Sequence, residues 1–123
     1  MRWSAWLLGT AILVATSAPA LPMSAEQRAG AIQALEVGDR EARIEINSVQ
    51  NFLKLKPGCL SEQEIADFRN RRKRFSDLRN EAGSWRDADD DTLSTALIVM
   101  RDNAHADAQL ALQMKHLAKV ESC

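Results

Sequence analysis

The residues most able to bind or react form a basic run, which reads Arg69-Asn70-Arg71-Arg72-Lys73-Arg74. Guanidinium and ammonium groups in such number suit an anion or an acidic protein surface. Because consecutive residues of a helix point in all directions, the run cannot form one flat cationic face. Two interpretations therefore stand side by side. Either the side chains pair with acidic residues of neighbouring helices, or they form a partner-binding surface made of Arg69, Arg71, Arg72, Lys73 and Arg74.

The overall charge argues against a nucleic-acid partner. The chain has 123 residues, with 16 Lys and Arg against 17 Asp and Glu, and its formal net charge is −1. Nucleic-acid binding needs a positive field and, for single strands, aromatic side chains placed among the basic ones. Aromatic residues make up only 5% of the chain, and none interrupts the basic run. We expect no nucleic acid among the partners.

A single carboxylate, Asp39, interrupts an otherwise apolar helix stripe. If two antiparallel helices join near residue 58, Asp39 lies level with about residue 77. Arg74 and Arg79 are then its nearest basic neighbours. We expect a structural ion pair, because such pairs fix helix register more surely than they add stability. A catalytic carboxylate is the alternative.

The two histidines, His105 and His116, stand eleven positions apart. On one helix they share a face but lie about 16 Å apart, so one metal ion cannot bind both. A metal site would need a dimer or further carboxylates. The chain also lacks the G-x-S-x-G, H-E-x-x-H and glycine-rich phosphate motifs. We expect no catalytic residues, no metal and no cofactor.

The two cysteines, Cys59 and Cys123, form no C-x-x-C motif. In an oxidising compartment two cysteines usually pair, so we expect an intramolecular disulfide between them. An intermolecular disulfide and a reactive thiol are the alternatives.

The N-terminus has the pattern of an export signal. Arg2 precedes an apolar stretch from Trp3 to Ala18, and Ala18-Pro19-Ala20 fits the small-x-small cleavage rule. The stretch is short for a membrane span, which needs about 20 residues. We therefore expect a signal peptide over residues 1–20, one domain over 21–123, and a periplasmic or secreted protein with no transmembrane span after cleavage. An uncleaved N-terminal anchor is the alternative.

Helix starts are clearly marked in the remaining chain. Ser24 with Gln27, and Ser61 with Glu64, have the spacing of capping boxes, in which each side chain bonds the other residue's backbone N–H. The acidic stretch 87–91 favours the positive end of a third helix dipole. Apolar positions then repeat at helical spacing in three stripes: Ile32, Leu35, Ala42, Ile46, Val49 and Leu53; Ile65, Phe68, Phe75, Leu78 and Ala82; and Leu93, Leu97, Met100, Ala104, Ala111, Met114 and Leu117.

Glycine and proline suggest where the helices end. Lys56-Pro57-Gly58 is a stop signal, and Gly83 suits the end of the second helix. Gly38, followed by Asp39, is expected to kink or break the first helix. No glycine or proline follows Gly83, so the third helix can extend to Val120.

These patterns predict an all-α fold, an up-down-up bundle of three helices, or four if the first breaks at Gly38, clipped by one disulfide. In this topology the end of the third helix returns to the loop that holds Cys59, in agreement with pairing to Cys123. A straight third helix would overshoot that loop by about 10 Å, so its last turn has to fray.

The function these observations favour is that of a small exported helical module that binds a protein partner, such as an adaptor, a chaperone or an inhibitor or immunity protein, without catalysis. Trp85, just past Gly83, is expected to cap the base of the core, and it is a further candidate partner contact if it instead lies on the surface. Monomer and homodimer both fit the sequence. The alternatives are a periplasmic metal- or stress-sensing helical hairpin, a membrane-anchored envelope protein of spanin type and, least favoured, an enzyme.

Overall fold

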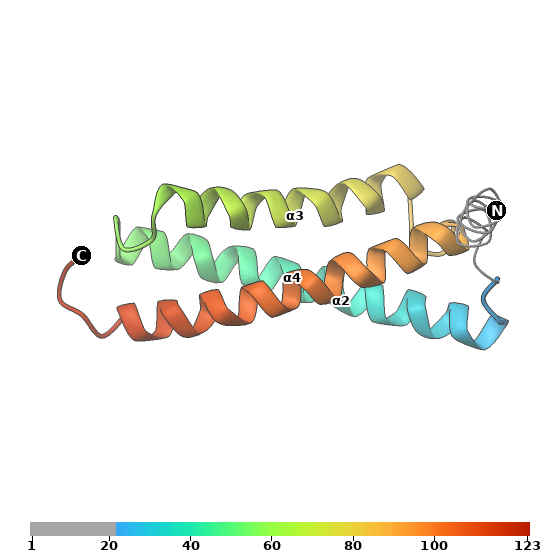
Figure 1. Ribbon diagram of the computed structural model, residues 1–123, viewed down its shortest axis with the longest axis horizontal. Coiled ribbons are helices and arrows are strands. Elements are labelled where there is room, and N and C mark those ends of the chain that lie inside the picture. The colour runs from blue at the N-terminus through green and yellow to red at the C-terminus, as the bar shows by residue number, and fades with distance from the viewer. Residues whose placement is uncertain (1–21) are drawn as a thin grey trace, which may run out of the picture.

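The computed structural model describes residues 22–123, which form three helices. They are α2 (Ala25–Leu55), α3 (Glu62–Ala82) and α4 (Asp90–Leu117). Figure 1 shows α2 and α4 running in one direction and α3 in the opposite one, and α4 packs against both of the others. The predicted all-α, up-down-up bundle is confirmed. The predicted signal peptide, 1–20, lies outside the described residues.

The predicted helix starts are present. Ser24 and Gln27 form a capping box at α2, and Ser61 and Glu64 form one at α3. The backbone N–H of Ser61 donates to the Glu64 carboxylate, and this bond holds the pKa of Glu64 below its usual value. Asp89 is the N-cap of α4, and its carboxylate accepts a 2.8 Å hydrogen bond from the backbone N–H of Thr92.

Gly38 does not break the first helix, contrary to the alternative with four helices. α2 continues through it, and Gly38 is buried where α2 crosses α4. A Cβ atom built at this position would collide with the sulfur of Met100 and lie 3.3 Å from its Cγ and 3.7 Å from Cζ of Phe75. The glycine therefore provides close approach between two helices, and its local helix penalty is offset by packing.

The predicted core stripe of α4 is wrong over its middle. Ala104 and Ala111 are exposed, whereas Asn103 and Asp107 are buried. The buried positions follow regular helical spacing: Leu93, Ala96, Val99, Asn103, Asp107 and Leu110. Because two of these buried residues, Asn103 and Asp107, are polar, the apolar pattern of the sequence pointed to Ala104 and Ala111 instead.

The core consists of two apolar clusters. One surrounds Trp85 and Phe75 near the α3–α4 connection, and its buried members are Leu35, Phe75, Trp85, Ala88, Leu93, Ala96 and Val99. The other lies near the α2–α3 connection and contains Val49, Leu60, Phe68 and Leu110. Asn103 and Asp107 fall between the two clusters in the α4 sequence, so the core is interrupted by polar side chains halfway along the bundle.

Each end of the bundle is held together by its own set of bonds. Arg28 of α2 reaches the start of α4, where its Nη1 lies 2.9 Å from Oδ1 of Asp90. Arg28 also donates to the carbonyl oxygens of Arg86 and Ala88. The backbone N–H of Met23 donates to the same Asp90 carboxylate at 2.9 Å. These bonds hold the start of α2 against the α3–α4 connection.

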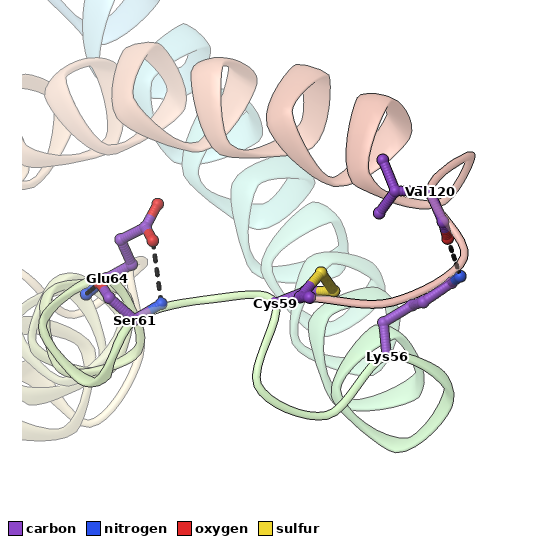
Figure 2. Close-up of a disulfide and its surroundings, with 6 residues drawn as sticks. Lys56, Cys59, Ser61, Glu64 and Val120 are labelled. Carbon is purple, nitrogen blue, oxygen red and sulfur yellow. Dashed lines mark hydrogen bonds between the residues drawn. A yellow bond between two sulfur atoms is a disulfide. The ribbon is translucent and has the colours of Figure 1, made fainter.

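At the opposite end the predicted disulfide is present. Cys59 and Cys123 are joined, with their Cα atoms 5.1 Å apart. α4 ends at Leu117 rather than at Val120, and the last residues fold back toward the α2–α3 connection (Figure 2). The Lys56 ammonium group donates to the Val120 carbonyl in this returning segment. The residues after Leu117 thus turn back and bring Cys123 to Cys59, which a straight α4 would have passed.

Two glycine substitutions on α2 should have opposite effects. We expect Gly38→Ala to lower the free energy of unfolding by about 1–2 kcal/mol, because its Cβ displaces Met100. Gly30→Ala is the matched control, because no atom lies within 4 Å of its new Cβ. It should raise stability by about 0.5–1 kcal/mol through helix propensity. Urea unfolding followed by circular dichroism tests both, and equal stabilisation by the two changes would contradict the close α2–α4 approach.

Removing the disulfide should lower stability strongly. The bond closes a loop between residues 64 positions apart. Replacing both cysteines by serine should therefore lower the free energy of unfolding by about 4 kcal/mol, as the chain entropy of the unfolded state rises. The wild-type chain under reducing agent should unfold at the same urea concentration as the double variant. An unchanged urea midpoint would show that the disulfide adds no stability.

Candidate functional site

The basic run of α3 is divided between the surface and the interior. Arg69, Lys73 and Arg74 are exposed, and Lys73 pairs with Asp77 one turn later at 2.7 Å. The side chains of Arg71 and Arg72 are only 22% and 14% exposed. Arg71 and Arg72 therefore follow the first interpretation, pairing with acidic residues of neighbouring helices, because both guanidinium groups turn inward to a carboxylate.

That carboxylate is Asp107 of α4, whose side chain is 5% exposed. Nε and Nη2 of Arg71 lie 3.0 and 2.9 Å from its Oδ1. Nη2 of Arg72 lies 2.5 Å from its Oδ2. Two guanidinium groups thus neutralise one buried carboxylate from two sides, as a charge removed from water requires.

Glu45 of α2 joins the same group. Its Oε2 lies 3.3 Å from Nη1 of Arg72, the same guanidinium group that contacts Asp107. Burial and the neighbouring Asp107 raise the pKa of Glu45 to about 7, although Arg72 acts in the opposite direction.

Asn103 and Phe68 complete this region. The Asn103 side chain donates a 3.1 Å hydrogen bond to the backbone carbonyl of Arg71. The guanidinium carbons of Arg71 and Arg72 lie 5.8 and 5.6 Å from the centre of the Phe68 ring, at cation–π distance. We call Glu45, Arg71, Arg72, Asn103 and Asp107 the polar layer, because all three helices contribute to it between the two apolar clusters.

The cavity beside the polar layer is small. It measures about 30 Å³ and is lined by Glu45, Arg72, Asn103 and Asp107, with Gly38 and Met100 on its other side. This volume corresponds to about one or two water molecules.

The predicted ion pair of Asp39 forms with Arg79 and not with Arg74. Nε of Arg79 lies 3.2 Å from Oδ2 of Asp39, whose side chain is 16% exposed. The indole N–H of Trp85 donates to the same oxygen at 2.9 Å. Within residues 22–123, Arg74 has no carboxylate at ion-pair distance. Asp39 therefore links α2 to α3 and to the α3–α4 connection.

Trp85 is a core residue and not a surface contact. It is 3% exposed and packs against Phe75, with the ring centres 5.5 Å apart. The expectation that Trp85 caps the core is confirmed, and the alternative of a surface contact does not apply, since its ring is enclosed and its indole N–H is bonded to Asp39.

His105 and His116 are both exposed on α4. In the described part of the chain, no group of three or more histidine, cysteine, aspartate or glutamate side chains is arranged to hold a metal ion.

A groove lies on the bundle surface between α2 and α4. It measures about 660 Å³ and is lined by Ala34, Val37, Gly38, Leu97, Met100 and Ala104. Glu41 lines it from α2 and Arg101 from α4, so the two walls carry opposite charges. Two strongly exposed apolar residues, Ile44 at 68% and Ile98 at 57%, follow these linings at helical spacing. The sequence did not reveal this groove, because three of the residues that line it, Ala34, Gly38 and Ala104, are small.

Comparison of the chain with protein-family models, curated proteins and solved structures gives no match.

Removing the Asp107 carboxylate should destabilise the bundle. We expect Asp107→Ala to lower the free energy of unfolding by about 3–5 kcal/mol, because two guanidinium groups lose their buried partner. Asp102→Ala is the control on the same helix, where the side chain is exposed, and it should change stability by less than about 0.5 kcal/mol. Thermal and urea unfolding measure both. Similar losses in the two variants would show that Asp107 is no more important than a surface carboxylate.

Proposed function

We propose that this chain is a small exported helical module that binds a protein partner through the α2–α4 groove and performs no catalysis. The observation that supports the proposal most directly is the groove itself, a hollow of about 660 Å³ whose lining is mostly apolar. Exposed apolar surface is typical of interaction sites.

The occupant that fits best is an amphipathic helix of the partner. Ala34 and Gly38 are one turn apart on α2, and Ala104 faces them from α4. Small residues at this spacing allow another helix to approach closely. Glu41 and Arg101 add opposite charges to the two walls, so the partner helix should carry a basic residue toward α2 and an acidic residue toward α4.

Export is the second part of the proposal. Its support is the signal-like pattern over residues 1–20 and the Cys59–Cys123 disulfide, which persists in an oxidising compartment. Among residues 22–123, no helix is both long enough and apolar enough to cross a membrane. The alternatives of a metal- or stress-sensing hairpin and of a membrane-anchored envelope protein gain no specific support from the described residues.

Blocking the groove should abolish partner capture. Ala104→Arg places a long cationic side chain in the groove, and because Ala104 is exposed, the apolar clusters stay intact. We expect capture of the protein partner from the envelope fraction of the source cells to fall at least tenfold. The measurement is quantitative affinity capture with the disulfide-bonded protein as bait.

Two variants provide the controls. Ala66→Arg makes the same change on an exposed position of α3, outside the groove, and should leave capture unchanged. Charge reversal of Arg69 and Arg74 tests the exposed remainder of the basic run. Capture that survives Ala104→Arg but is lost on this charge reversal would reject the groove and favour the α3 surface.

A further inference from the structure

The outer face of α4 carries apolar side chains on the line farthest from the core. Ile98 is 57% exposed and Leu112 is 68% exposed, and His105 between them is exposed as well. Each of the three follows by two positions a buried residue of the same helix, namely Ala96, Asn103 and Leu110. Because two residues turn an α-helix by about 200°, the three exposed side chains point away from the core and from both other helices.

The three residues belong to a longer series in which each position is seven residues from the next. The series starts at Asp91, in the first turn of α4, and ends at Lys119, just after the helix. Lys119 stays near the helical path, because its backbone N–H donates to the His116 carbonyl and that of Ala118 donates to Met114. Residues spaced by seven share one helix face, with a drift of about 20° per heptad. We call the series the α4 ladder, and its members are Asp91, Ile98, His105, Leu112 and Lys119.

The charged ends of the ladder are available for a contact. Asp91 and Lys119 are both exposed, and neither has an ion-pair partner within residues 22–123. The ladder thus has a carboxylate at one end, an ammonium group at the other and an apolar side chain next to each.

The ladder is complementary to itself when a second α4 lies along it in the opposite direction. With the two His105 side chains at the centre, Ile98 lies level with Leu112 of the second copy, and Asp91 lies level with its Lys119. Each apolar side chain then covers an apolar one, and each carboxylate meets an ammonium group. A two-fold axis through His105 makes both halves of this contact identical, as in most homodimers.

A parallel pair lacks this complementarity. It would place Asp91 against Asp91 and Lys119 against Lys119, and like charges in contact disfavour an interface. In the antiparallel pair the charged residues beside the centre lie level with uncharged ones, Arg101 with Gln109 and Asp102 with Ala108. The antiparallel arrangement also brings the positive end of each helix dipole near the negative end of the other.

We propose that two copies of this chain associate through the α4 ladder as an antiparallel homodimer with His105 on the two-fold axis. Because each copy contributes a single helix face, the association is weaker than that of an obligate dimer. The inference does not rest on the proposed function, since the ladder lies on the side of α4 turned away from α2 and α3, whereas the groove lies between α2 and α4.

The first test is sedimentation equilibrium of the disulfide-bonded protein over a range of concentrations at low salt. The wild-type chain should show a reversible equilibrium between monomer and dimer. Added salt should weaken the dimer, because Asp91 and Lys119 are exposed charges. A wild-type protein that stays monomeric up to about 1 mM would overturn the inference whatever the variants do.

Two isoleucine substitutions test the apolar part of the ladder. Ile98→Glu places a carboxylate against Leu112 of the second copy and should weaken dimerisation at least about tenfold. Ile44→Glu is the matched control, because it makes the same change at an isoleucine of α2 that is 68% exposed and lies outside the ladder. It should leave dimerisation unchanged, and circular dichroism should show full helix content in both variants. Equal losses in the two variants, or no loss in Ile98→Glu, would contradict the proposal.

A charge exchange tests the direction of the pair. Asp91→Lys should weaken dimerisation at least about threefold, because it sets two ammonium groups against each other at both ends. Adding Lys119→Asp restores opposite charges in the antiparallel pair and should return dimerisation to within about twofold of the wild type. In a parallel pair the double exchange would leave like charges at both ends. A double variant that does not recover, or a single variant without loss, would reject the antiparallel ladder.

Discussion

The bundle is organised around one buried carboxylate. Asp107 is 5% exposed and bonded by Arg71 and Arg72, so a charge of either sign left alone there would be strongly unfavourable. Because the two arginines belong to α3 and Asp107 to α4, these bonds tolerate little sliding of one helix along the other. The apolar clusters on either side are non-directional and set no such register. The polar layer thus fixes how α3 and α4 align along their lengths, and the two apolar clusters account for most of the buried apolar surface.

The first helix is held differently from the other two. Its ends are secured by Arg28 at the start and, through the following loop, by the disulfide of Cys59. Its middle depends on the close contact of Gly38 with Met100, on Asp39 and on the weakly bonded Glu45. The first helix is thus held by bonds at its ends and by close packing on α4 in its middle.

Much of the fold could be predicted from local patterns. The two capping boxes and the stop at Gly83 each follow from a short-range rule. The pairing of Cys59 with Cys123 follows from the expected export and from the up-down-up topology. Gly38 was misinterpreted because propensity describes one helix, whereas its role depends on Met100 of another. The polar layer was missed because Asn103 and Asp107 break the apolar period that marks a core. The exposure of Arg71 and Arg72 could not be judged from a run in which five of six residues are basic.

The most direct test of this account is a double-mutant cycle between Asp107 and Arg72, measured by urea unfolding of the disulfide-bonded chain. If the buried bonds organise the bundle, Asp107→Ala and Arg72→Ala should each cause a large loss of stability. The double variant should then lose less than their sum, with a coupling energy of about 1–3 kcal/mol. Losses that add within about 0.5 kcal/mol would contradict the account, because the two side chains would then act independently.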